Sequence, residues 1–549
     1  MGQNLEEEHR MRISVSACLL VAVTGTVVGQ SPTTTSLSPI FPSGQGGDLC
    51  NPILGSFAGS EIYQGFGTHV STEDGVAVVS VAAYSRDDGA DPSTIYTGSF
   101  FVYAFDNGLW DIVESVTGEA MLTDFDGRFH RIFYLANDVS EDTIVVRRFS
   151  QDYARVIDEF GIAAADQRDE SELLVFRHDN GEWLGEPQVI SQPNGVSPQF
   201  DLAYNPDQLF GYSVKVSGDW LAATDSYRDI SDTRVNAVHL YQFSSTSDTW
   251  TYVQTIAETA TPFGGSNHWR IELDGTPGDE ALIVYDVRDD EVGVYSLDTA
   301  GMIPEWVLET SFAGATGTGL TVGGYSGDVG FDGNTIVLAR RQSGSGSGGL
   351  AIHEGLLGGT WNRQTATSGD FNTSMVDVVD IEHDRILFAG RVGSSGGYQI
   401  FDYTPGSGGP ADFDLVDSCS GSPMSSCHVT GMASLGGGDS SSGIDGINVG
   451  AIAPHAAALD GSRALVADPD FDPDTTNIDC ARGRVFSFVY ACSAADLGMP
   501  FGQLDGADAV AFLQLYGAQD PAADLAAPFG TWDNSDYIVF LQLFGAGCP

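Results

Sequence analysis

The chain has 549 residues, an apolar fraction of 42% and a formal net charge of −52. This charge argues against nucleic acid as a partner, because binding phosphate groups requires a basic face. The apolar fraction is enough for a substantial core, and the 68 glycines among short apolar runs favour an all-β chain with many turns.

Residues 1–30 are predicted to be a secretory signal peptide. The apolar run Ile13–Val28 follows Arg10 and Arg12, and Val27–Gly29 fits a cleavage site of small residues. The residues before Met11 are too acidic for a signal, so we expect Met11 to be the true start. Since no other apolar run reaches ~18 residues, we expect no transmembrane segment and a secreted or cell-surface location.

Residues 31–49 are rich in Ser, Thr, Pro and Gly and show no hydrophobic periodicity. This composition is typical of a linker. We therefore expect the main folded domain to span residues 50–491.

The stretch Leu209–Trp250 has the pattern of a complete four-stranded blade. Tyr212–Val216 alternates polar and apolar residues, and the turn Ser217–Asp219 leads into the short apolar strand Trp220–Ala223. The polar loop Asp225–Thr233, a second alternating strand and an outer strand follow. Because the apolar strand is suited to burial on both faces, we expect it to lie near the hub of a β-propeller.

Weaker copies of this pattern recur, with polar turns at positions 74, 142, 219, 279, 332, 384 and 460. Five tryptophans follow the third strand of a copy and are expected to pack on outer strands: Trp110, Trp183, Trp250, Trp306 and Trp361. The copies indicate about seven blades. Six and eight stay open, because the second and sixth copies are weak.

The template stretch also carries a family resemblance. Phe210-Gly211, Ser213-Val214, Gly218-Asp219, Leu221-Ala222 and the run Val238–Phe243 resemble the FG-GAP repeat of integrin α-type propellers. The other copies are degenerate. The resemblance implies a propeller whose loops can bind calcium.

The cysteines fit an exported protein. Removing the signal peptide leaves an even number, as expected for disulfide pairing: Cys50, Cys419, Cys427, Cys480, Cys492 and Cys548. We favour Cys419–Cys427 as a small loop, Cys492–Cys548 as a clamp around the tail, and Cys50–Cys480 as a staple between the first segment and the last blade. Other pairings stay open.

Residues 492–549 form a second, smaller module built on a tandem repeat with a period of 28 residues. The segments Asp496–Asp520 and Asp524–Cys548 share 13 of 25 aligned residues. Each has an apolar set with helical spacing, expected to be its buried face: Ala509, Phe512, Leu513 and Tyr516, then Tyr537, Phe540, Leu541 and Phe544. The tail is therefore expected to be a small α-helical module.

This duplicated loop and helix resembles a dockerin. More narrowly, Ala523–Pro549 resembles the GC-type dockerin-like tail of secreted proteins from planctomycete-like bacteria. The resemblance implies a cohesin-like or surface anchor partner and calcium bound by carboxylates. The candidate ligands are Asp496, Asp505, Asp508, Asp524, Asp533 and Asp536. Gly498, Pro500, Ala526 and Pro528 stand where further oxygen ligands would be, which weakens the calcium prediction.

A second predicted calcium site lies after the apolar strand of the seventh copy. Asp468, Asp470, Asp472 and Asp474 alternate as ligands of a calcium loop do, and Asp479 follows. The alternative is a solvated acidic loop.

No catalytic constellation is recognisable. Hydrolytic propellers use paired carboxylates, but 75 acidic residues make coincidental pairs certain. We therefore expect an exported, non-catalytic propeller that binds a protein or polysaccharide and is anchored by its tail. The alternative is a carbohydrate-active hydrolase with the same anchor, which two carboxylates about 5–10 Å apart in the central funnel would favour.

Overall fold

The computed structural model describes residues 33–37, 60–87, 95–106, 109–116, 130–140, 142–152, 170–178, 183–193, 210–228, 234–257, 269–287, 289–301, 304–314, 325–342, 348–364, 376–382, 385–392, 395–404, 412–421, 457–460, 463–468, 484–489, 495–497, 504, 506–519, 523, 525–526 and 532–546. The proposed signal peptide and the cysteine side chains lie outside this description.

The described part of the chain is mostly β, and its strands form seven four-stranded antiparallel sheets. Six sheets use strands that are consecutive in sequence. The first is β2 (Ser60–Glu73), β3 (Val76–Asp87), β4 (Ile95–Asp106) and β5 (Leu109–Val116). The second is β6 (His130–Ser140), β7 (Thr143–Asp152), β8 (Glu170–Arg177) and β9 (Gln188–Ser191). The third is β10 (Val214–Ser217), β11 (Trp220–Arg228), β12 (Arg234–Ser244) and β13 (Thr249–Ala257).

The remaining three consecutive sheets follow the same order. The fourth is β14 (Trp269–Asp274), β15 (Ala281–Asp286), β16 (Glu291–Asp298) and β17 (Glu305–Ala313). The fifth is β18 (Tyr325–Asp332), β19 (Thr335–Gln342), β20 (Gly348–Glu354) and β21 (Asn362–Gln364). The sixth is β22 (Val376–Glu382), β23 (Arg385–Val392), β24 (Ser395–Thr404) and β25 (Asp412–Gly421).

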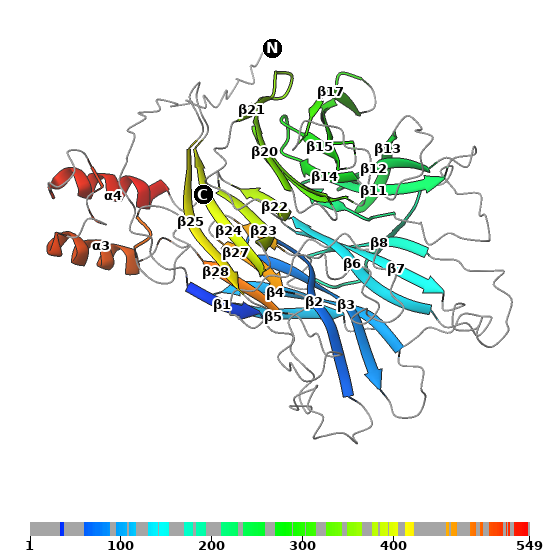
Figure 1. Ribbon diagram of the computed structural model, residues 1–549, viewed down its shortest axis with the longest axis horizontal. Coiled ribbons are helices and arrows are strands. Elements are labelled where there is room, and N and C mark those ends of the chain that lie inside the picture. Colours follow the sequence, from blue (N-terminus) through cyan, green and yellow to red (C-terminus); the bar gives the residue numbers. More distant parts are fainter. Residues whose placement is uncertain are drawn as a thin grey trace, which may run out of the picture.

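The sheets are arranged as a propeller, and they fan around a common centre in Figure 1. The first strand of each sheet contacts the first strand of the next, in the cyclic order β2, β6, β10, β14, β18, β22 and β26 (Ala457–Asp460), and β26 contacts β2 again. These first strands therefore surround the axis.

The last sheet corrects the expected domain boundary. It contains β26, β27 (Arg463–Asp468) and β28 (Arg484–Val489), and its fourth strand is β1 (Thr33–Leu37), which pairs with β28 antiparallel. The predicted linker thus contains a strand of the propeller. Composition concealed it, because β1 consists of three threonines, a serine and a leucine and has no hydrophobic alternation.

The apolar strand lies near the hub, as expected, but it is not the strand that surrounds the axis. Each turn used in the sequence analysis separates the first and second strand of a sheet, so the apolar strands β11 and β15 lie second from the axis. Residues such as Leu221 and Leu282 are fully buried there, since the neighbouring sheets cover both faces. The predicted loop at 225–233 is also shorter, because β11 continues to Arg228.

The predicted packing role of the tryptophans is confirmed where their side chains are buried. Trp183, Trp250, Trp306 and Trp361 are at most 8% exposed, at or just before the outer strands. Two of these tryptophans are also held by a glutamine side chain of the preceding sheet, which the sequence did not predict. The Gln188 amide accepts the N–H of Trp250 at 2.7 Å and donates to the Trp250 carbonyl at 2.8 Å. Gln254 holds Trp306 in the same way, at 2.7 and 3.0 Å. The outer strands are therefore fastened from sheet to sheet.

Two helices follow the sheets and lie side by side at one edge of the molecule in Figure 1, α3 (Gly506–Ala518) and α4 (Asn534–Ala546). Phe512 and Phe540 stack between them with ring centroids 4.2 Å apart. Leu513 and Leu541, expected in the buried face, are 58% and 48% exposed, and Tyr537 is 45% exposed. The buried stripe is rotated because the acidic side chains Asp508 and Asp536 occupy part of it. Among the described residues, no helix has the length and apolarity needed to span a membrane.

Candidate functional site

Charged side chains gather on the strands around the axis. Asp138 on β6, Lys215 on β10, Glu272 on β14 and Asp380 on β22 each lie two residues before the end of their strand. Equal positions on first strands place these side chains at one level of the channel. We call these four residues the axial cluster. Lys215 is the only lysine in the chain.

The attraction between Lys215 and the three carboxylates stabilises the axial cluster. The Lys215 ammonium lies 2.7 Å from the Glu272 carboxylate, and the two side chains are 19% and 12% exposed. Burial by itself would lower the pKa of Lys215, but Glu272, Asp138 and Asp380 together raise it above its ordinary value. The amine therefore stays protonated at neutral pH.

The carboxylates at the axis also satisfy backbone groups of the neighbouring sheet. Asp138 accepts the N–H of Val216, and Asp380 accepts the N–H of Leu459, both at 2.7 Å. Asp460 accepts the N–H of Gly75 at 2.8 Å and thereby joins the last sheet to the first. A first strand has one edge facing the axis, where its N–H groups need acceptors. Asp138 and Asp380 supply one acceptor each, for Val216 of β10 and Leu459 of β26.

A hydroxyl and a glycine join the third sheet to the fourth. The Ser217 hydroxyl accepts the N–H of Gly275 at 2.9 Å. A Cβ on Gly275 would lie 2.0 Å from the Ser217 carbonyl oxygen, so only glycine allows this approach.

The cavity at the axis is small. It has a volume of about 30 Å³, and its lining includes His69, Asn137, Arg270 and Asp328 from four first strands and Ser213 just before a fifth. That volume has room for about two water molecules, since one needs ~10–15 Å³, and it is far below the roughly 300 Å³ of a small-ligand pocket. The Arg270 guanidinium lies over the Tyr212 ring, 4.8 Å from its centroid. The described part of the axis therefore accommodates water but not a sugar ring.

Two carboxyls at the ends of first strands, Glu73 on β2 and Asp460 on β26, have raised pKa values. Burial raises the pKa of Glu73 to about 8, and the charges of Asp138, Asp74 and Glu382 add to the effect. Burial likewise raises the pKa of Asp460, although Arg463 opposes it. Glu73 is consequently protonated at neutral pH, while Asp138 is held beside a lysine.

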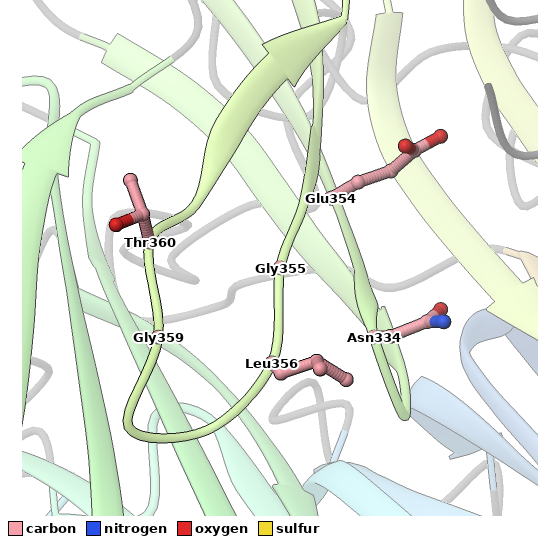
Figure 2. Close-up of a pocket in the computed structure, with 6 residues that line it drawn as sticks. All are labelled: Asn334, Glu354, Gly355, Leu356, Gly359 and Thr360. Atoms are coloured by element: carbon pink, nitrogen blue, oxygen red, sulfur yellow. The ribbon is translucent and has the colours of Figure 1, made fainter. Parts of the chain in front are cut away.

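A larger pocket, of about 410 Å³, lies at the connection between β20 and β21. Figure 2 shows the loop 355–360 with the side chains of Asn334 and Glu354 directed to the same side. The Glu354 carboxylate accepts hydrogen bonds from the Tyr403 hydroxyl and from the Gln364 amide, the latter at 2.7 Å. Leu356 is 68% exposed beside it. The pocket has the volume for a small ligand, but its carboxylate already has two partners.

A buried polar network crosses the third sheet. His239 lies 3.0 Å from Asp225 through Nε2 and 2.8 Å from the Thr255 hydroxyl through Nδ1. Asp225 and His239 are fully buried, and the Gln192 amide donates to the same Asp225 oxygen at 2.5 Å. The order hydroxyl, imidazole and carboxylate is that of a hydrolytic triad. Thr255 lies within β13, paired to His239 across the ladder, so the network ties three strands together.

The predicted calcium ligands of the tail differ in burial and in the groups that they contact. Asp508 is 1% exposed and accepts the N–H of Leu497 at 2.8 Å. Asp536 is fully buried and accepts the N–H groups of Ala526 and Asp533, at 2.8 and 2.9 Å. Asp533 is exposed and accepts the N–H of Ser535 at 2.7 Å, which lowers the pKa of its carboxyl. Asp508 and Asp536 therefore cap the loops that precede their helices.

Most of the other predicted calcium ligands lie partly or wholly outside the described residues. Asp496 is 1% exposed. For Asp468 the structure describes only the backbone, at the end of β27, while Asp470, Asp472, Asp474, Asp479, Asp505 and Asp524 lie outside the described residues. Among the residues that are described, no three His, Cys, Asp or Glu side chains form a group able to hold a metal ion. The calcium sites stay predictions.

Sequence reasoning missed the axial cluster, although a signal was present. Asp138, Lys215 and Asp380 each lie four residues before the turn positions 142, 219 and 384, so aligning the copies by their turns would have placed these three in one column. Glu272 lies seven residues before position 279, because the turn after β14 is longer.

No protein-family model matches the chain, and no curated protein matches it in sequence. Solved structures of similar arrangement include a hypothetical selenium-binding protein from Sulfolobus tokodaii, with a TM-score of 0.33 and 9% identity, covering 62% of this chain and 75% of that one. YjhT has a TM-score of 0.29 and 9% identity, with 67% and 97% covered. Prolyl oligopeptidase B from Galerina marginata has a TM-score of 0.31 and 9% identity, with 65% and 50% covered.

Proposed function

We propose that this chain is an exported, non-catalytic β-propeller that binds a protein or polysaccharide and is held at the cell surface, or in a complex, by its dockerin-like tail. The observation that carries the non-catalytic part is the state of the axial carboxylates. Asp138, Asp380 and Asp460 accept backbone N–H groups, and Glu272 is paired with Lys215. Such carboxylates hold the ring together, and the cavity of about 30 Å³ beside them is too small for a sugar.

The tail supports the anchoring part. Val510 and Leu513 on α3 are 54% and 58% exposed, and the residues 28 positions later, Ile538 and Leu541 on α4, are 54% and 48% exposed. Each helix thus presents an equivalent apolar pair while its phenylalanine is buried. Exposed apolar side chains gathered on one small module are typical of a protein-binding surface.

The charge of the tail indicates what kind of protein it would bind. Residues 496–549 contain seven aspartates and no lysine, arginine or histidine. We therefore expect a protein partner with an apolar centre and a basic rim, since rim charges of opposite sign speed and orient association.

The test is localisation in the producing cells. The full chain, a chain lacking residues 492–549 and a Leu513→Glu/Leu541→Glu double variant are compared by surface fractionation, with Leu356→Glu as the control at an exposed leucine of the propeller. We expect both tail variants to move to the culture fluid and the control to stay at the surface. An unchanged distribution of both tail variants would contradict anchoring.

The alternative function, a carbohydrate-active hydrolase, keeps one observation in its favour. Burial and the charge of Asp138 raise the pKa of Glu73 to about 8, as is expected for the general acid of an acid–base pair. Release of reducing sugar from a polysaccharide panel that disappears in both Glu73→Gln and Asp138→Asn would support it. Binding without turnover supports the non-catalytic function.

A further inference from the structure

The last sheet differs from the others in how its outer strand arrives. In the third sheet four residues, Ser245–Asp248, join β12 to the outer strand β13. The outer strand β1 of the last sheet pairs with β28, from which it is separated by most of the chain, and 22 residues lie between Leu37 and Ser60. At ~3.3–3.6 Å per residue, that segment can span roughly 75 Å.

The acceptor strand is firmly positioned without β1. β28 pairs along its length with β27, and Val485 is fully buried in the core between the last and first sheets. The Ser487 hydroxyl accepts a hydrogen bond from the Trp110 indole at 2.7 Å. The outer edge of β28 is therefore a prepared template for one more strand.

Strand β1, which pairs with this edge, has a sequence of low complexity. β1 is Thr-Thr-Thr-Ser-Leu, and its register joins five residue pairs from Thr33–Val489 to Leu37–Val485. Backbone hydrogen bonds dominate such a pairing, and β1 of another molecule would make the same ones. Pairing of β28 with its own β1 and pairing with β1 of a second copy differ only in how β1 is connected to the rest of the chain. The concentration of the protein therefore determines which of the two pairings forms.

We propose that the outer edge of β28 is a strand-exchange interface, which accepts residues 33–37 from a second copy of this chain in the antiparallel register seen within one copy. Reciprocal exchange gives a closed two-fold dimer, because the same surfaces are used twice. One-way exchange gives a chain of molecules. Crowding of copies on a surface favours either product over the closed monomer.

The test uses two full-length preparations with different affinity tags. They are mixed at about millimolar concentration under reducing conditions, warmed close to the unfolding midpoint, cooled and diluted, and the mixed-tag fraction is measured by sequential affinity capture. Reduction prevents cysteine cross-links from producing the same result. We expect mixed-tag dimers from the natural sequence and a roughly tenfold lower yield from Thr34→Pro/Thr35→Pro, because proline removes ladder donors. Gln45→Pro, outside β1, is the matched control and should leave the yield unchanged.

A second arm does not depend on the proline variant folding. A synthetic peptide of residues 31–39 in large excess during cooling should suppress mixed-tag dimers of the natural sequence at least fivefold, and a peptide of the same composition in scrambled order should not. Absence of mixed-tag dimers after annealing, dimers that persist in the proline variant, or equal effects of the two peptides would each overturn the proposal.

Discussion

Buried carboxylates occur in two regions of this molecule, the propeller axis and the helical tail, and they do related work in different surroundings. At the axis, Asp138 and Asp380 accept N–H groups from a neighbouring sheet and also face a lysine. In the tail, Asp508 and Asp536 accept N–H groups from the loop before their own helix. The axis joins distant parts of the chain, whereas the tail organises local ones.

The difference shows how an acidic chain should be interpreted. The spacing of the tail aspartates along the chain predicted calcium ligands, whereas the axial carboxylates come together only across sheets and lie far apart in the sequence. In both regions a buried carboxylate accepts backbone N–H groups, which are satisfied in nearly all folded proteins. At Asp536 both carboxylate oxygens already accept N–H groups, so a calcium ion there would have to share them.

Removing the axial lysine should have the largest effect. Lys215→Met leaves Glu272, Asp138 and Asp380 without their cation, and breaking a buried ion pair costs about 3–5 kcal/mol. We expect chemical denaturation to show a loss of that size. Arg385→Met is the control, because its partner Asp402 is 54% exposed and exposed pairs contribute about 0–1 kcal/mol. Equal losses in the two variants would refute the structural role of the axial cluster.

The tail carboxylate should come next. Asp536→Ala leaves the N–H groups of Ala526 and Asp533 without their acceptor, and a lost cap costs about 1–2 kcal/mol. Thermal unfolding of the full chain, followed on the tail by hydrogen exchange of α4, measures this effect. The same scan with added chelator separates capping from calcium. A chelator effect in the natural chain that vanishes in Asp536→Ala would show that this carboxylate is a metal ligand.

The third prediction concerns pH. The pKa of Glu73 is about 8 in the folded chain, above its ordinary value of 4.5. A raised carboxyl pKa adds stability below pH 4.5 that is lost progressively as pH rises to 8. Glu73→Gln should therefore be more stable than the natural chain at pH 8.5, by about 1–2 kcal/mol after allowance for partial solvent exposure, and nearly equal to it at pH 4.5. A constant difference at both pH values would exclude titration of Glu73 as the cause.

The smallest effect is expected at the outer strands. Gln254→Leu removes two hydrogen bonds to the Trp306 backbone, and Gln188→Leu removes the matching pair at Trp250. Each should lose about 1 kcal/mol, because water replaces part of the interaction at the rim. Similar shifts in the two urea midpoints would establish a repeated fastening device. An effect in one variant alone would limit it to that junction.

Much of the fold could be predicted, because turns and strands are local patterns. The turn at Ser217–Asp219, the strands flanking it and the outer tryptophans were recognised from alternation and turn residues, and the helices of the tail from their apolar spacing. The strand boundaries and the identity of the strand nearest the axis could not be predicted. Alternation shows that a strand has a buried face without showing what covers it. Leu513 and Leu541 were misplaced for the same reason.

The amino-acid sequence by itself determined the repeating unit, its turns and the two-part organisation, since these depend on contacts between near neighbours in the chain. Only the tertiary structure decided which strands surround the axis, that Lys215 meets carboxylates from three other sheets, and that residues 33–37 complete the last sheet. Those features depend on contacts between residues far apart in the chain, which no local pattern records.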